Sequence, residues 1–179
     1  MRYLITLLSL SLIIIACNKE STAPDSTLIL YDSFEVEGAG SYRNWTIEEG
    51  LTDFDNSTPA DGGAVSLKLT ADGDIEGCAV KEIVADHGDG IYEFSVWARM
   101  SANQPESTGY AIFGVSDDDG VIQEKTVMLT DTVWTCYTIV DTLTFEAGNY
   151  LYMKLSPGLP EGDNTWYSLF DVVRVEKAE

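Results

Sequence analysis

The chain has little positive charge. Ten Lys and Arg residues stand against 30 Asp and Glu residues, so the 179 residues carry a formal net charge of −20. Such a charge repels nucleic acid and anionic lipid surfaces. It also disfavours acidic glycans, whereas a neutral polysaccharide or oligosaccharide meets no such repulsion. The composition therefore excludes nucleic acid as a partner and favours an uncharged one.

The sequence also lacks the motifs of common catalytic sites. Its single histidine, His87, lies in the segment DHGDG, which is typical of an exposed turn. It contains neither a G-x-S-x-G motif nor the E-x-D-x-x-E motif of jelly-roll glucanases. A carboxylate pair for glycoside hydrolysis is a spatial arrangement that sequence does not reveal. We expect no catalytic residues, and a glycanase or polysaccharide lyase is the less favoured alternative.

The N-terminal apolar run is too short to span a bilayer as a stable helix. The segment MRYLITLLSLSLIIIAC has one Arg, an apolar stretch and a small residue before Cys17, as secretory signal peptides do. Its last four residues, IIAC, resemble the lipobox of bacterial lipoproteins. The resemblance implies a signal peptide over 1–16 and a mature chain that starts at lipidated Cys17. It also implies anchoring in the bacterial cell envelope, at the outer membrane, facing the periplasm or the outside. The polar residues up to 27 predict a flexible tether.

Cysteine is scarce beyond this leader, where only Cys78 and Cys136 remain. Export would place both in an oxidising compartment, so they could form a disulfide. Two buried free thiols are the main alternative, because sequence does not reveal the distance between them. A metal site is disfavoured, because no further soft ligands lie nearby in the sequence.

Residues 28–179 contain many short strand patterns and no amphipathic helical pattern of three turns, which predicts a single all-β domain of the sandwich or jelly-roll type. Clusters of Gly and Asp separate the strands, and SDDDG at 116–120 predicts a hairpin turn. The predicted strands are 28–36, 44–49, 63–71, 78–85, 91–100, 109–116, 124–130, 133–145, 149–156 and 166–176.

The order of several fragments resembles a known family. The fragments SFE, GGAVSLKL, GDGIYEFSVWAR, TDTVWTCYTIV and LFDVVRVE follow one another as in the galactose-binding-like jelly-roll carbohydrate-binding modules of the CenC-type, xylan- and glucan-binding group. The resemblance implies two antiparallel sheets and a glycan-binding surface on the concave sheet or its rim. It also implies a structural calcium ion. The closing fragment departs from the family, because Val172 stands where a second acid is usual.

Two strands place aromatic residues where water is expected. In YEFSVWARM (92–100), Trp97 and Arg99 alternate with the apolar residues, and in NYLYMKLS, Tyr150, Tyr152 and Lys154 do the same. The resembled fold implies that both strands belong to one sheet, so the five residues should share a carbohydrate-binding surface. Aromatic rings would stack on sugar C–H faces while the cations bind hydroxyl groups. The alternative is that Trp97 packs beneath a loop or at the sandwich edge.

The other tryptophans have different expected roles. The resemblance implies structural roles for Trp45 and Trp134, and the role of Trp166 stays open.

The resemblance also matches Glu35 and Asp171 with the family's calcium carboxylates, with carbonyl groups near Gly62 or Gly63 completing the oxygen shell. The parity that Asp171 shares with Leu169 and Val173 predicts that it faces inward. A buried carboxylate needs a partner, so the alternative is an Asp satisfied by hydrogen bonds alone. We thus expect a lipid-anchored protein that binds carbohydrate without cleaving it. The alternative is an adhesive or structural module that contacts other envelope proteins.

Overall fold

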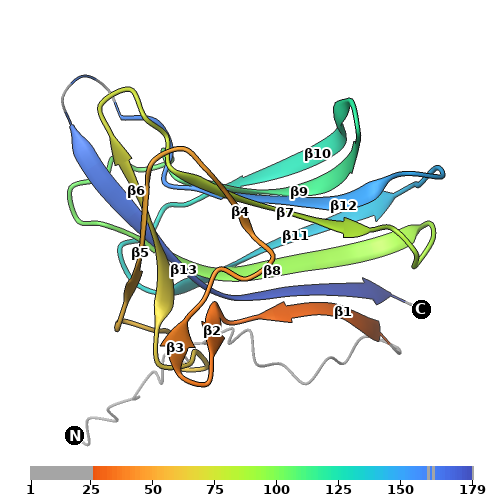
Figure 1. Cartoon of the computed structure of the whole chain (residues 1–179), viewed down its shortest axis with the longest axis horizontal. Helices are drawn as coiled ribbons and strands as arrows, with labels where there is room; N and C mark the ends of the chain where they lie inside the picture. Colours follow the sequence, from red (N-terminus) through yellow and green to blue (C-terminus); the bar gives the residue numbers. More distant parts are fainter. Residues whose placement is uncertain (1–25, 161, 163, 179) are drawn as a thin grey trace, which may run out of the picture.

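Two antiparallel sheets pack face to face in the computed structural model, which describes residues 26–160, 162 and 164–178 (Figure 1). The six-stranded sheet has the order β11-β8-β13-β6-β5, with β1 also paired to β13, and the five-stranded sheet has the order β10-β9-β12-β7-β4. This arrangement confirms the predicted all-β jelly-roll sandwich. In the part of the chain so described, no helix is long and apolar enough to cross a membrane. The expected signal peptide, Cys17 and most of the tether lie outside the described residues.

The strands have the following bounds: β1 Ser26–Asp32, β2 Glu35–Val36, β3 Ala39–Gly40, β4 Thr46–Glu48, β5 Leu51–Asp55, β6 Ser66–Asp72, β7 Cys78–Val84, β8 Gly90–Met100, β9 Tyr110–Asp117, β10 Gly120–Met128, β11 Thr135–Leu143, β12 Tyr150–Ser156 and β13 Thr165–Ala178.

The core lies between the two sheets because alternate residues of their strands are apolar. On β8, Phe94 and Val96 are fully buried, and the Phe94 ring stacks on Phe113 of β9 with centroids 5.4 Å apart. Side chains of β10 close one side of the sandwich. Gln123 and Lys125 donate to the backbone carbonyls of Thr142 and Val140 on β11, the edge strand of the six-stranded sheet. These bonds occupy part of an edge that would otherwise be open to pairing with another chain.

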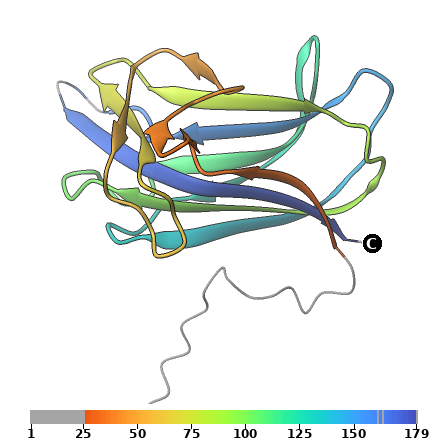
Figure 2. The same cartoon turned by 60° about the horizontal axis from the view of Figure 1, so that its bottom comes forward.

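β13 organises the six-stranded sheet. Its first half pairs with β6 and its second half with β1, while β8 pairs along most of its other side (Figure 2). The register with β8 shifts between Asp171 and Arg174, and Val172 has a φ of 47° there. This bulge reverses the parity of the strand, since Phe170 reaches the core before it and Val173 after it.

Each of the ten predicted strand regions contains a strand, with ends that differ by a few residues. The region 28–36 is divided, because Phe34 has a φ of 55° and separates β1 from β2. The sequence did not predict β3 or β5. In β5, LTDFD, the apolar residues Leu51 and Phe54 have opposite parity, so the strand shows no apolar alternation.

Candidate functional site

The outer face of the five-stranded sheet carries the main candidate site. On β12, Leu151, Met153 and Leu155 are fully buried in the core, so Tyr150, Tyr152 and Lys154 point to the other face. Tyr152 pairs with Glu82 on β7 and with Gly114 on β9. Gly114 has no side chain, and the backbone of Gln123 on β10 occupies the place where one would lie.

This face forms a groove of about 570 Å³. Its charged lining residues, Glu48 and Glu82, are both acidic. The β9–β10 hairpin contributes to the wall and curls outward beyond the sheet (Figure 1). The groove is lined by Asn44, Thr46, Glu48, Val80, Glu82, Ser116, Gly120, Val121 and Tyr152.

The carboxylate of Glu82 is held in place within this groove. The hydroxyl of Ser116 donates to Glu82 Oε1 over 2.5 Å, across the strand β12 that separates them. No hydrogen bond to the second oxygen, Oε2, is present among the described residues, and the side chain is exposed. Glu82 thus presents an oriented acceptor beside the Tyr152 ring.

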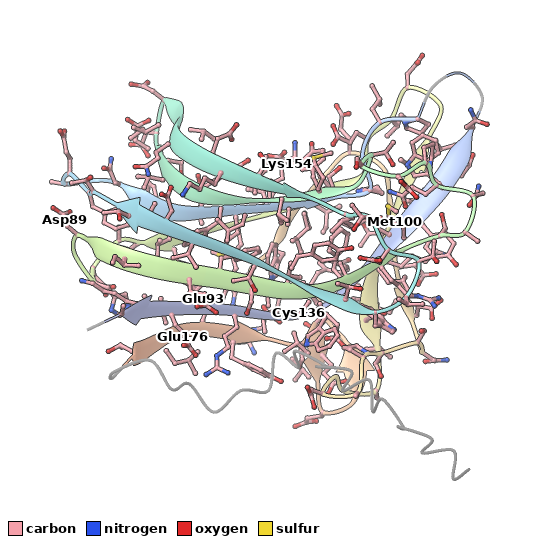
Figure 3. The ribbon with its side chains drawn as sticks, turned by 180° about the vertical axis from the view of Figure 1, so that it is seen from behind. Asp89, Glu93, Met100, Cys136, Lys154 and Glu176 are labelled. Atoms are coloured by element: carbon pink, nitrogen blue, oxygen red, sulfur yellow. The ribbon has the colours of Figure 1, made fainter. Side chains whose placement is uncertain are left out.

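A second polar group lies on the same face, toward the end of β12. Glu76 Oε1 accepts hydrogen bonds from the Tyr110 hydroxyl and, over 2.5 Å, from Ser156 Oγ. Burial and the bond to Glu76 raise the pKa of Tyr110 to about 12, so its hydroxyl stays protonated. The Lys154 ammonium lies 5.8 Å from the Tyr110 ring centroid, and its charge faces outward from the five-stranded sheet (Figure 3).

The expected surface of five residues does not form. Trp97 and Arg99 belong to β8 in the six-stranded sheet, whereas Tyr150, Tyr152 and Lys154 belong to β12 in the five-stranded sheet. Both groups point away from the shared core, so they lie on opposite sides of the sandwich. Figure 3 shows this separation between Lys154 and Cys136, the cross-strand neighbour of Trp97. The prediction of one sheet, which rested on the resemblance, was wrong. Alternation within each strand could not correct it, because alternation does not reveal which strands are neighbours.

Trp97 and Arg99 have local partners instead. Trp97 is partly buried between Cys136 and Asp171 on the adjacent strands, and the Arg99 guanidinium lies 5.9 Å from the Trp134 ring centroid. Trp134 Nε1 donates to Ser57 Oγ over 3.3 Å, which ties this face to the loop between β5 and β6. Because β8 lies between β11 and β13, Trp97 is not at an edge of its sheet, and it stays partly exposed.

A Cys78–Cys136 disulfide is excluded. Cys78 lies on β7 of the five-stranded sheet and is a free, buried thiol, while Cys136 lies on β11 of the six-stranded sheet. Burial raises the pKa of Cys78 to about 11, so the thiol is protonated at neutral pH.

The second candidate site contains Asp171 and Glu35, which the sequence paired as cation ligands. Both carboxylates press against the loop before β6. A Cβ atom added to Gly62 would lie 2.3 Å from Asp171 Oδ2, and one added to Gly63 would lie 2.0 Å from Glu35 Oε1. Glu35 Oε2 accepts a hydrogen bond from the Ala64 amide over 2.7 Å. The two acids thus both lie against this loop.

The prediction placed Asp171 on the same side of the strand as Val173. The bulge that follows Asp171 reverses the side-chain direction, so Val173 points into the core while Asp171 points to the outside of its sheet. The loop nevertheless covers it completely, and its exposed fraction is 0%. Oδ1 accepts from the Val172 amide, while Oδ2 is buried without a hydrogen-bond partner. Burial raises the pKa of Asp171 to about 7, helped by the charges of Glu35 and Asp32.

These observations fit a hard cation. A fully buried carboxylate oxygen with no donor is costly, and a cation would satisfy it. Among the described residues no three acidic, His or Cys side chains gather as a metal cage. Calcium bound here would therefore need backbone carbonyls and water besides Glu35 and Asp171, which is common for this ion.

The structure also places two other tryptophans, the SDDDG turn and the single histidine. Trp45 is 5% exposed and packs on Phe34 in the core, as predicted for a structural residue. Trp166 is 4% exposed and donates to the Pro157 carbonyl, so it too is structural. The SDDDG turn forms, with Asp117 Oδ1 accepting from two turn amides. His87 is exposed and lies 3.2 Å from Asp86.

Sequence reasoning missed Glu48, Glu82, Glu76 and Tyr110. On β7, CAVKEIV is apolar on both faces, so no alternation marked Glu82 as a groove residue. The positions of all four relative to Tyr152 depend on cross-strand register, for which a single sequence offers no direct signal.

The chain matches no protein-family profile and no curated protein. Solved structures do resemble it. The CBM22-1 xylan-binding domain of Paenibacillus barcinonensis Xyn10C superposes with a TM-score of 0.61 at 19% identity, over 88% of this chain and 98% of that domain. TmCBM61, solved with β-1,4-galactotriose, has a TM-score of 0.51 at 15% identity, over 76% and 90% of the two chains.

A third similar structure comes from a different kind of protein. The K3 cleaved adhesin domain of Lys-gingipain from Porphyromonas gingivalis has a TM-score of 0.51 at 16% identity, over 85% of this chain and 99% of that domain. All three identities are low, so these likenesses establish the fold alone. The chain has the galactose-binding-like jelly-roll fold found in carbohydrate-binding modules.

Proposed function

We propose that the protein binds a neutral polysaccharide or oligosaccharide on the outer face of the five-stranded sheet, without cleaving it. The observation that carries this proposal is the position of Tyr152 in a groove beside the oriented carboxylate of Glu82. A pyranose ring has an apolar C–H face that stacks on a phenol ring, and its hydroxyl groups donate to carboxylates. The fold shared with a xylan-binding domain and a galactotriose-binding module supports the same reading.

Tyr150 extends this surface along β12. Residues two apart on a strand point to the same face, roughly 6.7 Å from each other. Tyr150 pairs with Val84, which is 63% exposed, so an apolar surface continues beyond Tyr152. Lys154, two residues past Tyr152 in the other direction, offers a hydrogen-bond donor. We infer that these three residues of the predicted set contact the ligand and that Trp97 and Arg99 do not.

The charge of the groove favours an uncharged ligand. Glu48 and Glu82 would repel the carboxylates or sulfates of acidic glycans, in a molecule that is already strongly negative. In a non-catalytic role these acids act only as hydrogen-bond acceptors.

Isothermal titration of the mature protein against neutral xylan, glucan and mannan oligosaccharides, with polygalacturonate as the acidic comparison, tests the proposal. We expect heat only with neutral ligands, about tenfold weaker binding in Tyr152→Ala, and unchanged binding in Trp97→Ala. Absence of binding to every glycan would overturn the proposal. Equal losses in both variants would contradict the choice of face, and release of reducing ends would show an enzyme.

A calcium ion is proposed for the second site. Glu35 and Asp171 would hold it, and the bound charge would satisfy the Asp171 oxygen that has no donor. Its role would be structural, because it joins β2, β13 and the loop before β6.

We further propose that Cys17 carries lipid and anchors the domain in the bacterial outer membrane. The support is the lipobox-like tetrapeptide at 14–17. Mass spectrometry of the mature N-terminus would detect acyl chains on Cys17, and unmodified Cys17 in the mature protein would refute the anchor.

An adhesive role is the second candidate, because the fold is shared with an adhesin domain. The groove face would then contact a partner envelope protein. Loss of a protein complex in Tyr152→Ala, with no glycan binding by the unsubstituted protein, would favour this role.

A further inference from the structure

We propose that a largely buried polar cluster of Asp32, Trp45 and Lys81 is a positioning device for the groove wall that β4 and β7 form. The inference rests on the proposed function, because the position of the wall affects binding only if the groove binds a ligand. The cluster itself lies inside the sandwich and touches no ligand.

Alternation connects this cluster with the groove. Asn44 and Thr46 line the groove, and Trp45 between them points inward. On the neighbouring strand Val80 and Glu82 line the groove, and Lys81 between them points inward. Each inward residue is therefore joined by the backbone to two residues of the wall.

The contacts within the cluster span the sandwich. Asp32, at the end of β1 in the six-stranded sheet, accepts from Trp45 Nε1 over 2.9 Å and pairs with the Lys81 ammonium at 3.4 Å. Its other oxygen accepts from the Phe34 amide over 2.9 Å, which fixes the carboxylate. The Lys81 ammonium also lies 5.4 Å from the Trp45 ring centroid. One carboxylate thus holds two strands of the opposite sheet.

Lysine is an unusual choice at this position. Lys81 is only 7% exposed, and its cross-strand partner on β12 is the fully buried Met153. An apolar side chain would suit such surroundings, since burying an ammonium is costly unless it is paired. The charge makes the packing more specific. The Lys81–Asp32 ion pair forms in one arrangement of the two strands, whereas apolar contacts allow several arrangements.

β4 depends on such a contact to fix its position, because little else holds it. It has three residues, lies at the edge of its sheet and, among the described strands, pairs only with β7. Asn44, just before it, has a φ of 63°, so the chain enters the strand through a turn. Three residues of edge pairing hold a strand weakly, and the indole of Trp45 provides its anchor in the core. Loss of the cluster should therefore loosen Asn44, Thr46 and Glu48, and binding would have to order them again.

Lys81→Met tests the proposal, because it removes the charge and keeps most of the stem. Lys81→Arg restores a cation, and Trp45→Phe keeps a ring without its N–H as a milder second variant. Val96→Ala is the matched control, since Val96 is fully buried on β8 in the other sheet. Two measurements are made on each folded mature protein: amide hydrogen exchange in β4 and β7 without ligand, and titration with the neutral oligosaccharide that the unsubstituted protein binds.

We expect Lys81→Met to speed exchange in β4 and to weaken binding about tenfold, with partial recovery in Lys81→Arg and a smaller loss in Trp45→Phe. Val96→Ala should lower stability without either effect. Unchanged exchange in β4 in both Lys81→Met and Trp45→Phe would overturn the proposal. Unchanged affinity in both, in a protein that binds glycan, would do the same. If the unsubstituted protein binds no glycan, the proposed function fails separately, and the exchange result alone decides the positioning role.

Discussion

At the scale of single residues, Tyr152 and Glu82 would have different tasks in the proposed sugar-binding surface. The Tyr152 ring is partly buried and its hydroxyl has a raised pKa, chiefly through burial, so it presents a neutral ring to a ligand. Glu82 supplies an acceptor whose orientation Ser116 fixes. Stacking alone binds any sugar with an apolar face, whereas an oriented acceptor distinguishes between hydroxyl arrangements.

Glu82→Gln should therefore weaken binding of a neutral oligosaccharide about tenfold, because a hydrogen bond to a charged group contributes about 1.5–3 kcal/mol and an amide oxygen accepts less strongly. Titration of the variant measures the loss. Glu93→Gln, on the six-stranded sheet, is the matched control and should bind as the unsubstituted protein does. Unaltered affinity in Glu82→Gln would remove this residue from the site.

At the scale of elements, the bulge in β13 decides where Asp171 points. Val172 is β-branched and has a φ of 47°, a conformation that such residues avoid. The strand accepts this strain, on the order of 1–3 kcal/mol, and as a result Asp171 lies under the loop that contains Gly62. The strained residue lies next to a carboxylate whose Oδ2 atom is buried without a donor, which agrees with a site that gains a cation.

Val172→Gly should leave the stability of the chain unchanged or raise it by up to about 1 kcal/mol, because glycine adopts positive φ without strain. The comparison is Val140→Gly on β11, where φ is not positive and the side chain is 51% exposed. There the loss of β-propensity should cost about 1 kcal/mol. Urea unfolding of both variants measures these changes, and equal destabilisation would mean that Val172 is not strained.

At the scale of the whole molecule, the two candidate sites belong to different sheets and have different tasks. The groove covers the outer face of the five-stranded sheet, whereas Asp171 and Glu35 lie at the outer side of the six-stranded sheet, beneath a loop. Asp32 carries negative charge near Asp171 while it also pairs with Lys81 under the groove. Because acidic residues are in excess, a bound cation would reduce the repulsion between them and stabilise the fold.

The stability of the calcium-free protein should fall as pH rises. The folded-state pKa of Asp171, about 7, lies above the ordinary value of 3.8, so the protonated form stabilises the fold. This contribution is complete below about pH 4 and is lost as pH rises through about 7, amounting to a few kcal/mol at about 1.4 kcal/mol per pKa unit. Calcium should reverse the trend, because it binds the deprotonated carboxylate.

Thermal melts at pH 5 and pH 8, with calcium or with chelator, measure this dependence. Asp171→Asn is the informative variant. It should be more stable than the unsubstituted protein at pH 8 in chelator, and it should gain little from calcium. A melting temperature that calcium does not change at pH 8 would contradict the cation site.

Much of the fold was predictable from local pattern. Short apolar patterns, most of them alternating with the period of two that a strand imposes, marked ten strand regions, and Gly and Asp clusters marked the turns. Glu35, Asp171, Gly62 and Gly63 were also placed together by resemblance to the family. β5 was missed because its apolar residues have opposite parity, and the direction of Asp171 was missed because a bulge reverses parity without a sequence signal.

Sequence by itself determined that the chain forms a β-sandwich, and it determined which side of β12 is apolar, so that Tyr150, Tyr152 and Lys154 point outward. Only the tertiary structure decided which sheet each strand joins. That choice placed Trp97 on the opposite face, separated Cys78 from Cys136 and brought Glu48 and Glu82 beside Tyr152. The reason is physical: direction within a strand follows from the chain's own geometry, whereas strand order depends on contacts between segments far apart in the sequence.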